Sequence, residues 1–138
     1  MRVDERIFRI SFILRRIAVA YDGSESSKVA LDIALELSRV LGSQITVLHA
    51  CREGECSDEI LDEARERAKS KGVEVEIKKL VYGDKSSIAS ELLKEINNGF
   101  YDLVIMGARG NSYSEELKIG SVAAAVVMNS TTSFFIVR

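Results

Sequence analysis

Short apolar runs alternate with amphipathic stretches along this chain of 138 residues, and this alternation constrains the fold more than any other feature. Apolar runs typical of strands lie at residues 17–21, 45–50, 102–106 and 133–137, and residues 73–82 alternate partly, which suggests a further strand. Apolar residues recur at helical spacing in residues 29–41, 57–70, 86–97 and 121–128. Because helices of this length serve as crossovers between parallel strands, we predict one α/β domain. Its sheet is expected to be doubly wound and mostly parallel, with helices on both faces.

The ends of the predicted helices must be set without proline, because the chain contains none. Ser24 is a candidate N-cap for the first helix, and Gly42 is a natural stop after it. Lys78 and Lys79 in the third predicted strand are expected to be exposed, which suits an edge of the sheet.

The charge and the apolar runs exclude some classes of protein. The formal net charge is −2, whereas a nucleic-acid-binding domain normally carries a strongly basic face. No apolar run approaches the roughly 20 residues that span a bilayer, so we expect no membrane association. Arg9 interrupts the apolar start, and no small-residue cleavage site follows it. The expected location is therefore the cytoplasm.

Cys51 and Cys56 are the two cysteines of the chain. Their four-residue gap does not suit a zinc ribbon, and no second pair follows. A disulfide between them is conceivable, but a domain of this size does not need one. We therefore expect two incidental thiols.

The glycine-rich segment after the fourth predicted strand contains the strongest signal for function. Gly107 and Gly110 follow the strand directly, and Gly120-Ser121 opens the last helix. Glycines let backbone amides approach an anion, and a helix N-terminus adds unpaired N–H groups and a positive dipole end. The segment therefore predicts a phosphate cradle without a lysine. The alternative is a flexible surface loop with a glycine helix start.

The same segment resembles the nucleotide signature of ATP-binding universal stress proteins. It matches the family pattern Gly-x2-Gly-x9-Gly-Ser without a gap. The stretches at residues 17–24, 47–50 and 102–107 also look like that family's first, second and fourth strands. The resemblance covers residues 15–138, and it implies five strands in the order 3-2-1-4-5.

The resemblance implies an adenine-nucleotide site where the loops after the first and fourth strands meet. Ligands of such sheets bind beyond the carboxyl ends of the strands, where the strand order reverses. Asp22 would lie near the ribose or a phosphate-bound Mg2+, although it could also be a turn residue before Gly23. The implied adenine neighbours are Ala20, Tyr21, Ala50 and Met106. Ribose and phosphates would contact Gly107, Arg109, Gly110, Gly120, Ser121 and Val122. The implied ligand is ATP, or AMP or ADP, with or without Mg2+.

Two features depart from the family pattern. The family often has prolines before the last strand, where this chain has residues 129–133 without one. Glu115 and Glu116 lie inside the glycine-rich segment and would repel phosphates if they faced inward. We expect them to face solvent or to need a bound cation.

Fast catalysis is not expected. The P-loop lysine motif is absent, and so is a Gly-x-Gly-x-x-Gly fingerprint after the first strand. His49 is interpreted as structural, because it is flanked by apolar residues in a strand. Ser24 and Ser121 have no evident base. ATP hydrolysis, if it occurs, should be slow.

The two ends of the chain suggest contacts with a second copy. The strand Ser133–Val137 is apolar, and in the resembling family it pairs with its twin, which implies a homodimer. Residues 1–14 are too apolar to be left in solution. They could add a strand, cover a neighbouring subunit, or come from an early start codon.

Three functions therefore compete. The first is a nucleotide-binding regulatory homodimer of the stress response. The second is an interaction module of the same fold that binds no nucleotide. The third is a slow ATPase or phosphotransferase. The intact glycine spacing favours the first, and the missing lysine and base disfavour the third.

Overall fold

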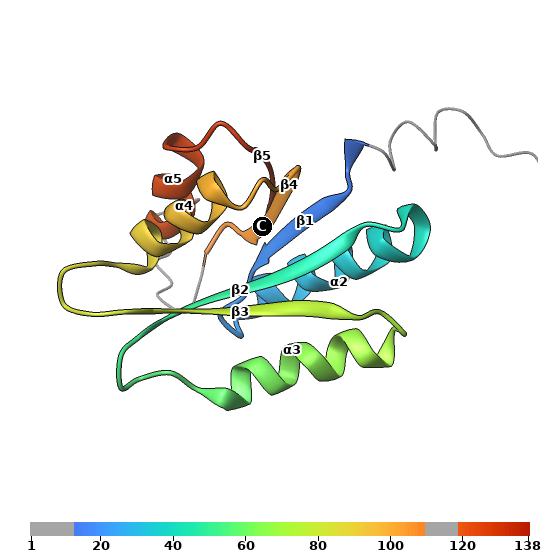
Figure 1. Ribbon diagram of the computed structural model, residues 1–138, viewed down its shortest axis with the longest axis horizontal. Coiled ribbons are helices and arrows are strands. Elements are labelled where there is room, and N and C mark those ends of the chain that lie inside the picture. The colour runs from blue at the N-terminus through green and yellow to red at the C-terminus, as the bar shows by residue number, and fades with distance from the viewer. Residues whose placement is uncertain (1–12, 110–118) are drawn as a thin grey trace, which may run out of the picture.

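Five parallel strands form one sheet in the order β3-β2-β1-β4-β5, as predicted. The computed structural model describes residues 13–109 and 119–138. Along the chain the elements are β1 (Arg16–Ala20), α2 (Glu25–Leu41), β2 (Gln44–Arg52), α3 (Asp58–Ser70), β3 (Val75–Tyr82), α4 (Ile88–Asn98), β4 (Leu103–Gly107), α5 (Ser121–Met128) and β5 (Ser133–Val137). Figure 1 shows α4 and α5 together on one side of the sheet and α3 on the other.

The first helix begins and ends at the predicted residues. The Ser24 side chain accepts a hydrogen bond from the Ser27 amide at 3.3 Å, which is N-capping geometry. Gly42 ends the helix in the left-handed conformation, with φ at 76°, and its amide donates to the Ser38 carbonyl. A left-handed residue of this kind favours glycine, so Gly42 stops α2 cleanly.

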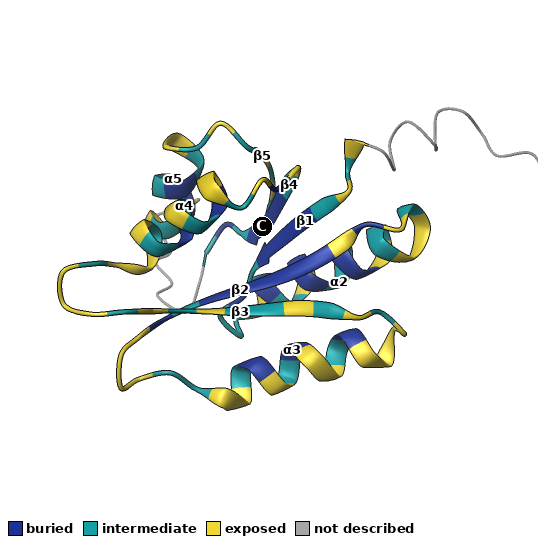
Figure 2. Ribbon diagram, viewed as in Figure 1, coloured by how far each residue is buried: buried dark blue, intermediate teal, exposed yellow. Residues whose placement is uncertain are grey.

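The two faces of the sheet bury separate hydrophobic clusters. Ile17 and Val19 of β1 pack with α2 and α3, whereas Ala18 between them packs with α4 and α5. All three residues are fully buried. Figure 2 shows the central strands β1, β2 and β4 as the most buried part of the sheet. Strands covered on both faces explain why the sequence of these strands is a continuous apolar run.

The two edge strands differ in character. On β3 half-buried and exposed positions largely alternate, and Lys79 is exposed as predicted. Lys78 is only half exposed, because its ammonium group pairs with Glu95 of α4 at 3.1 Å. On β5 Phe135 is 47% exposed. Charged residues therefore protect one edge, and the other edge is apolar.

The turn before β5 forms without proline. The Ser130 hydroxyl donates to the Asn97 side chain at 3.0 Å, and the Thr132 amide donates to the Ser130 hydroxyl at 3.2 Å. Ser130 therefore links this turn to the end of α4. The departure from the family pattern leaves β5 in its expected place.

The predicted extension at residues 1–14 lies mostly outside the described residues, which begin at Ile13. The amides of Arg15 and Arg16 donate to the Asp102 carboxylate at 3.0 and 2.9 Å. These bonds join the start of β1 to the start of β4. No helix within the described ranges is both long and apolar enough to cross a membrane.

Candidate functional site

A pocket of about 330 Å³ opens at the carboxyl ends of β1 and β4. These two strands are neighbours at the point where the strand order reverses, which is where ligands bind in sheets of this class. The pocket is lined by all the predicted site residues that the structure describes: Ala20, Tyr21, Asp22, Ala50, Met106, Gly107, Arg109, Gly120, Ser121 and Val122. The loops after β1 and β4 therefore border one pocket, and the binding of a ligand there stays a prediction. Gly110, Glu115 and Glu116 lie outside the described residues.

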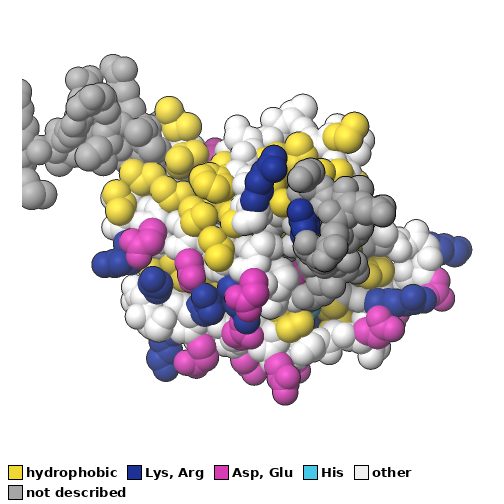
Figure 3. Space-filling model, turned by 180° about the vertical axis from the view of Figure 1, so that it is seen from behind, with side chains coloured by type: hydrophobic (Ala, Val, Ile, Leu, Met, Phe, Trp, Pro, Cys, Tyr) yellow, Lys and Arg dark blue, Asp and Glu magenta, His cyan; other side chains and the backbone are white. Residues whose placement is uncertain are grey.

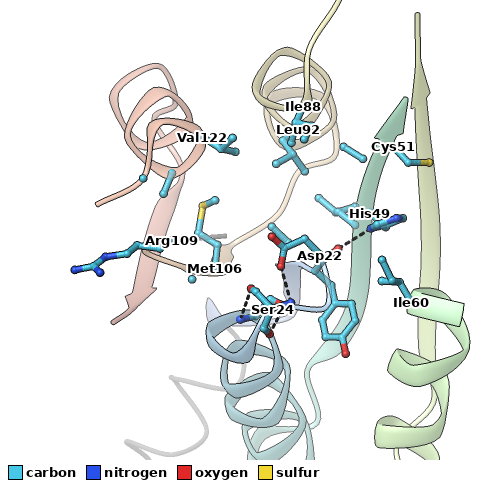
Figure 4. Close-up of a pocket in the computed structure, with 18 of the residues that line it drawn as sticks. Asp22, Ser24, His49, Cys51, Ile60, Ile88, Leu92, Met106, Arg109 and Val122 are labelled. Atoms are coloured by element: carbon cyan, nitrogen blue, oxygen red, sulfur yellow. Dashed lines mark hydrogen bonds between the residues drawn. The ribbon is translucent and has the colours of Figure 1, made fainter. Parts of the chain in front are cut away.

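One half of the pocket is an apolar slot. Met106 of β4 and Leu92 of α4 are 4% and 3% exposed, and they face Val122 of α5 across the slot (Figure 4). Ile88, in the first turn of α4, is 38% exposed and lies at the opening. Leu48 of β2 forms part of the lining. An apolar lining of this kind suits an aromatic ring system.

Sequence reasoning did not assign the α4 residues to the site. The stripe of apolar residues on α4 predicts a buried face, and Leu92 does belong to the hydrophobic cluster. The stripe does not reveal that its first turn borders a cavity. A helix that starts at the carboxyl end of the sheet is the signal that could have indicated this.

Asp22 lies beside the slot, in the loop after β1 (Figure 4). One carboxylate oxygen accepts a hydrogen bond from the Ser24 amide at 2.9 Å. This is an Asx turn that delivers the chain into α2. The turn interpretation of Asp22 is therefore correct, and the carboxylate also borders the pocket. Its position is compatible with a ribose hydroxyl or a hydrated cation.

Gly107 has a packing role in this structure. A Cβ atom added to it would lie 2.1 Å from Ser26 Oγ and 2.8 Å from Ser26 Cβ. Its φ is outside the left-handed region that favours glycine. Gly107 is thus needed because the first turn of α2 crosses the end of β4 closely, and not because of a special backbone conformation.

The start of α5 forms the side of the pocket where the sequence predicts a phosphate cradle. The Gly120 amide donates to the Ala108 carbonyl, and Gly120 is the N-cap of α5. Ser121 is exposed and lines the pocket. The first-turn amides of a helix have no acceptor within the helix, and they carry its positive dipole end. Of the predicted cradle, the N-terminus of α5 therefore borders the pocket. The Gly120 amide is already bonded to the Ala108 carbonyl.

Arg109 is held through its backbone. Its carbonyl accepts a hydrogen bond from the Ser26 hydroxyl at 2.6 Å. In Figure 4 the guanidinium group extends away from the slot. The backbone of Arg109 therefore contributes to the pocket wall, and its side chain does not contact the slot lining drawn there.

Tyr21 and His49 support the site from the α3 side of the sheet. The Tyr21 hydroxyl donates to the Glu63 carboxylate at 2.7 Å, and burial together with this bond raises the pKa of Tyr21 well above its usual range. His49 is 5% exposed, and its Nδ1 lies 2.8 Å from the Tyr21 carbonyl. The burial of His49 and its contact with Tyr21 agree with a structural role, although His49 also borders the pocket.

The expectation of two incidental thiols is wrong, because Cys51 and Cys56 form a disulfide. Their Cα atoms are 5.1 Å apart, within the range that a disulfide spans. Gly54 between them has φ at 84°, which lets the chain turn back on itself. The glycine between the two cysteines is the sequence signal that could have indicated this bond.

The loop that contains this disulfide is a wall of the pocket that the sequence did not predict. Arg52, Glu55 and Ser57 line the pocket beside Cys51. Arg52 forms an ion pair with Asp84 in the turn after β3. This wall places one positive and one negative side chain at the mouth of the cavity.

Two features of the described part of the site bear on catalysis. Ser24 Oγ already caps α2 by accepting a hydrogen bond from the Ser27 amide. Within residues 13–109 and 119–138 no cluster of three or more metal-binding side chains occurs. A cation at Asp22 would therefore need ligand oxygens from a phosphate or from water, as Mg2+ commonly does.

Comparison with known proteins agrees with this geometry. The model of the universal stress protein family matches residues 14–138. The universal stress protein YxiE of Bacillus subtilis (strain 168) is 30% identical over 152 aligned positions, which cover 91% of this chain and 100% of YxiE. A solved universal stress protein in complex with cAMP is 28% identical, with a TM-score of 0.72, over 90% of this chain and 96% of that one. The Archaeoglobus fulgidus universal stress protein in complex with dAMP is 21% identical, with a TM-score of 0.71, over 91% and 99% of the two chains.

Proposed function

The chain belongs to the universal stress protein family, and we propose that its pocket binds an adenine nucleotide. ATP is the favoured ligand, with ADP or AMP as alternatives. The bound nucleotide would regulate a homodimer in a cytoplasmic stress response. Turnover would be slow or absent.

The single observation that carries this proposal is the pairing of an apolar slot with a helix N-terminus in one pocket. The slot between Met106 and Val122 suits an adenine ring, and the start of α5 at Ser121 suits phosphates. Asp22 between them suits a ribose hydroxyl or a phosphate-bound Mg2+. The complexes of family members with cAMP and dAMP support an adenine-containing ligand.

The same residues argue against fast hydrolysis. Splitting ATP needs an oriented water, a metal clamp and charge stabilisation at the leaving group. Asp22 is the carboxylate of the β1 loop that could hold Mg2+, and the Arg109 side chain extends away from the slot (Figure 4). We therefore expect any turnover to be well below the roughly 10 per second typical of enzymes.

A pair of substitutions at Ser121 tests the proposal. Ser121 is exposed, so Ser121→Glu should fold, and a carboxylate in the first turn of α5 is favourable to the helix dipole. The same carboxylate would repel a phosphate. We expect Ser121→Glu to weaken ATP binding at least about tenfold, which corresponds to roughly 1.4 kcal/mol.

Ser121→Gln is the matched control, because it adds similar bulk without charge. It should lose at most a few-fold in affinity, and both variants should unfold at or above the wild-type temperature. Equal loss in both variants would mean that bulk, and not charge, blocks the site. Unchanged ATP binding in Ser121→Glu would show that the phosphates lie elsewhere.

A second candidate is an interaction module that binds no nucleotide. It is favoured by one observation: Gly107 has a packing reason to be glycine, because it contacts Ser26 of α2. Part of the glycine signature could therefore be retained without a ligand. Under this alternative neither the wild type nor the Ser121 variants would bind ATP, and no adenine nucleotide would raise the melting temperature.

The homodimer is proposed from the apolar edge of the sheet. Within the described residues β5 is paired on one side only, with β4. Phe135 of β5 and Val29 of α2 are 47% and 46% exposed. Hydrophobic side chains also gather on the face opposite to the view of Figure 1, above a more charged region (Figure 3). Pairing of β5 with its twin would cover this edge.

A further inference from the structure

The Cys51–Cys56 disulfide lies at the mouth of the pocket. Cys51 is the second-last residue of β2, is 7% exposed and lines the cavity. Cys56 lies beyond the turn at Gly54, is more exposed, and does not line the cavity. Figure 4 shows Cys51 at the end of β2, on the same side of the pocket as His49. The bond thus joins a pocket residue to a surface loop.

The residues inside this covalent ring form part of the pocket wall. Arg52 and Glu55 lie between the two cysteines, and both line the cavity. Ser57, directly after Cys56, lines it as well and precedes α3. A change in the position of this loop would therefore change the shape and the charge of the pocket mouth.

Few other interactions hold the loop. The Glu53 amide donates to the Tyr82 carbonyl at 2.8 Å, and the Glu55 amide donates to the Arg52 carbonyl at 2.9 Å. The ion pair of Arg52 with Asp84 lies between side chains that are 52% and 85% exposed, where ion pairs contribute little. Residues 52–55 are all exposed. The disulfide is thus the main restraint on the loop among the interactions described.

The hydrophobic clusters of the domain do not include this bond. The ring spans a sequence separation of five, and so short a ring restrains the unfolded chain less than a long one would. A disulfide outside the hydrophobic clusters, partly accessible and next to a pocket is suited to reversible chemistry.

We propose that Cys51 and Cys56 are a redox couple that controls this wall of the pocket. The control of ligand affinity rests on the proposed function, whereas the redox couple itself does not. The oxidised form fixes the loop, and the reduced form releases it. The reductant is a dithiol and the oxidant is a disulfide of the same class.

The reaction is a thiol–disulfide exchange. A thiolate of the dithiol attacks Cys56 Sγ, the S–S bond breaks, and Cys51 leaves as a thiolate that takes up a proton. The second thiol of the reductant then attacks the mixed disulfide and releases the Cys56 thiol. The protein gains two electrons and two protons, and the dithiol becomes a cyclic disulfide.

Release of the loop lowers the affinity for the nucleotide, because the wall must then be ordered at the moment of binding. Ordering a few exposed residues is expected to weaken binding roughly three- to tenfold. Residues 52–57 should also exchange their amide hydrogens faster in the reduced protein, because their openings become more frequent.

The test compares oxidised and dithiothreitol-reduced wild-type protein with a Cys56→Ser variant. Cys56 does not line the pocket, so this variant opens the ring without changing the cavity lining. We expect reduction to release both thiols, to speed amide exchange over residues 52–57, and to weaken ATP binding roughly three- to tenfold. Cys56→Ser should match the reduced wild type and should not respond to dithiothreitol.

The outcomes separate the two proposals. Faster exchange in the reduced protein without ATP binding in either state would retain the redox couple and reject the proposed function. Equal ATP affinity in both states would reject control of the pocket. A bond that native protein does not exchange with dithiothreitol, or amide exchange that is unaffected by reduction, would overturn the redox couple itself.

Discussion

Replacing Gly107 by alanine should destabilise the domain, because the added methyl group would clash with Ser26. The added methyl group would lie 2.1 Å from Ser26 Oγ and 2.8 Å from Ser26 Cβ. Rotation of the Ser26 hydroxyl could relieve the first contact, but it would break the 2.6 Å hydrogen bond to the Arg109 carbonyl. The second contact involves Cβ, which no rotation moves, so α2 and the end of β4 would have to separate.

The magnitude follows from these two terms. Loss of the hydrogen bond costs about 1 kcal/mol, and overpacking in a closely packed place costs about 1–3 kcal/mol. The sum is about 3 kcal/mol, which corresponds to a fall in melting temperature of about 10 °C for a domain of this size. Gly83→Ala is the matched control, because a Cβ there meets nothing within 4 Å and its φ does not require glycine.

A double-mutant cycle with Ser26→Gly tests the reasoning. This second change removes both contacting atoms and leaves the Arg109 carbonyl, at 3.2 Å, as the nearest neighbour of the new methyl group. Chemical unfolding of the four proteins should give a coupling of about 1–2 kcal/mol in favour of the double variant. Additive losses, or a Gly107→Ala variant as stable as Gly83→Ala, would refute the packing explanation.

Three further substitutions probe the core, the support and the edge of the sheet. Leu92→Ala should lower the free energy of unfolding by about 2–5 kcal/mol in urea titrations, because Leu92 is buried at the slot; a loss under 1 kcal/mol would contradict its burial. Tyr21→Phe should cost about 1 kcal/mol at neutral pH, through loss of the bond to Glu63. That bond holds the pKa of Glu63 below its ordinary 4.5, so its contribution is present above pH 4.5 and is lost as the pH falls through the lowered pKa. Acid titration of stability should therefore be steeper for the wild type than for Tyr21→Phe, and identical slopes would contradict this. Phe135→Glu should convert a homodimer to a monomer in light scattering, and a wild type that is already monomeric would reject the proposed interface.

The order of elements could be predicted from the sequence because local signals and tertiary packing agree. Ser24 and Gly42 set the ends of α2 where their cap chemistry predicts. The continuous apolar run of β4 predicts a strand buried on both faces, and the structure confirms it. The convergence of the β1 and β4 loops follows from the parallel topology alone.

The parts that could not be predicted depend on contacts between distant segments. Gly107 must be glycine because Ser26 packs against it, and nothing in the local sequence of either residue indicates this contact. Ile88 belongs to the same apolar stripe as the rest of α4, and only the position of the helix brings it to the pocket. The Cys51–Cys56 bond is an exception, because it is local: it depends on the turn at Gly54, a signal that the prediction of two incidental thiols did not use.

Titration calorimetry of the oxidised wild-type protein with ATP and Mg2+ tests the central claim most directly. The account predicts saturable binding of about one ATP per chain, with ADP and AMP competing for the same site because all three share the adenine ring. The absence of binding heat and of any thermal shift at millimolar ATP, ADP and AMP would contradict it, and would favour the interaction module.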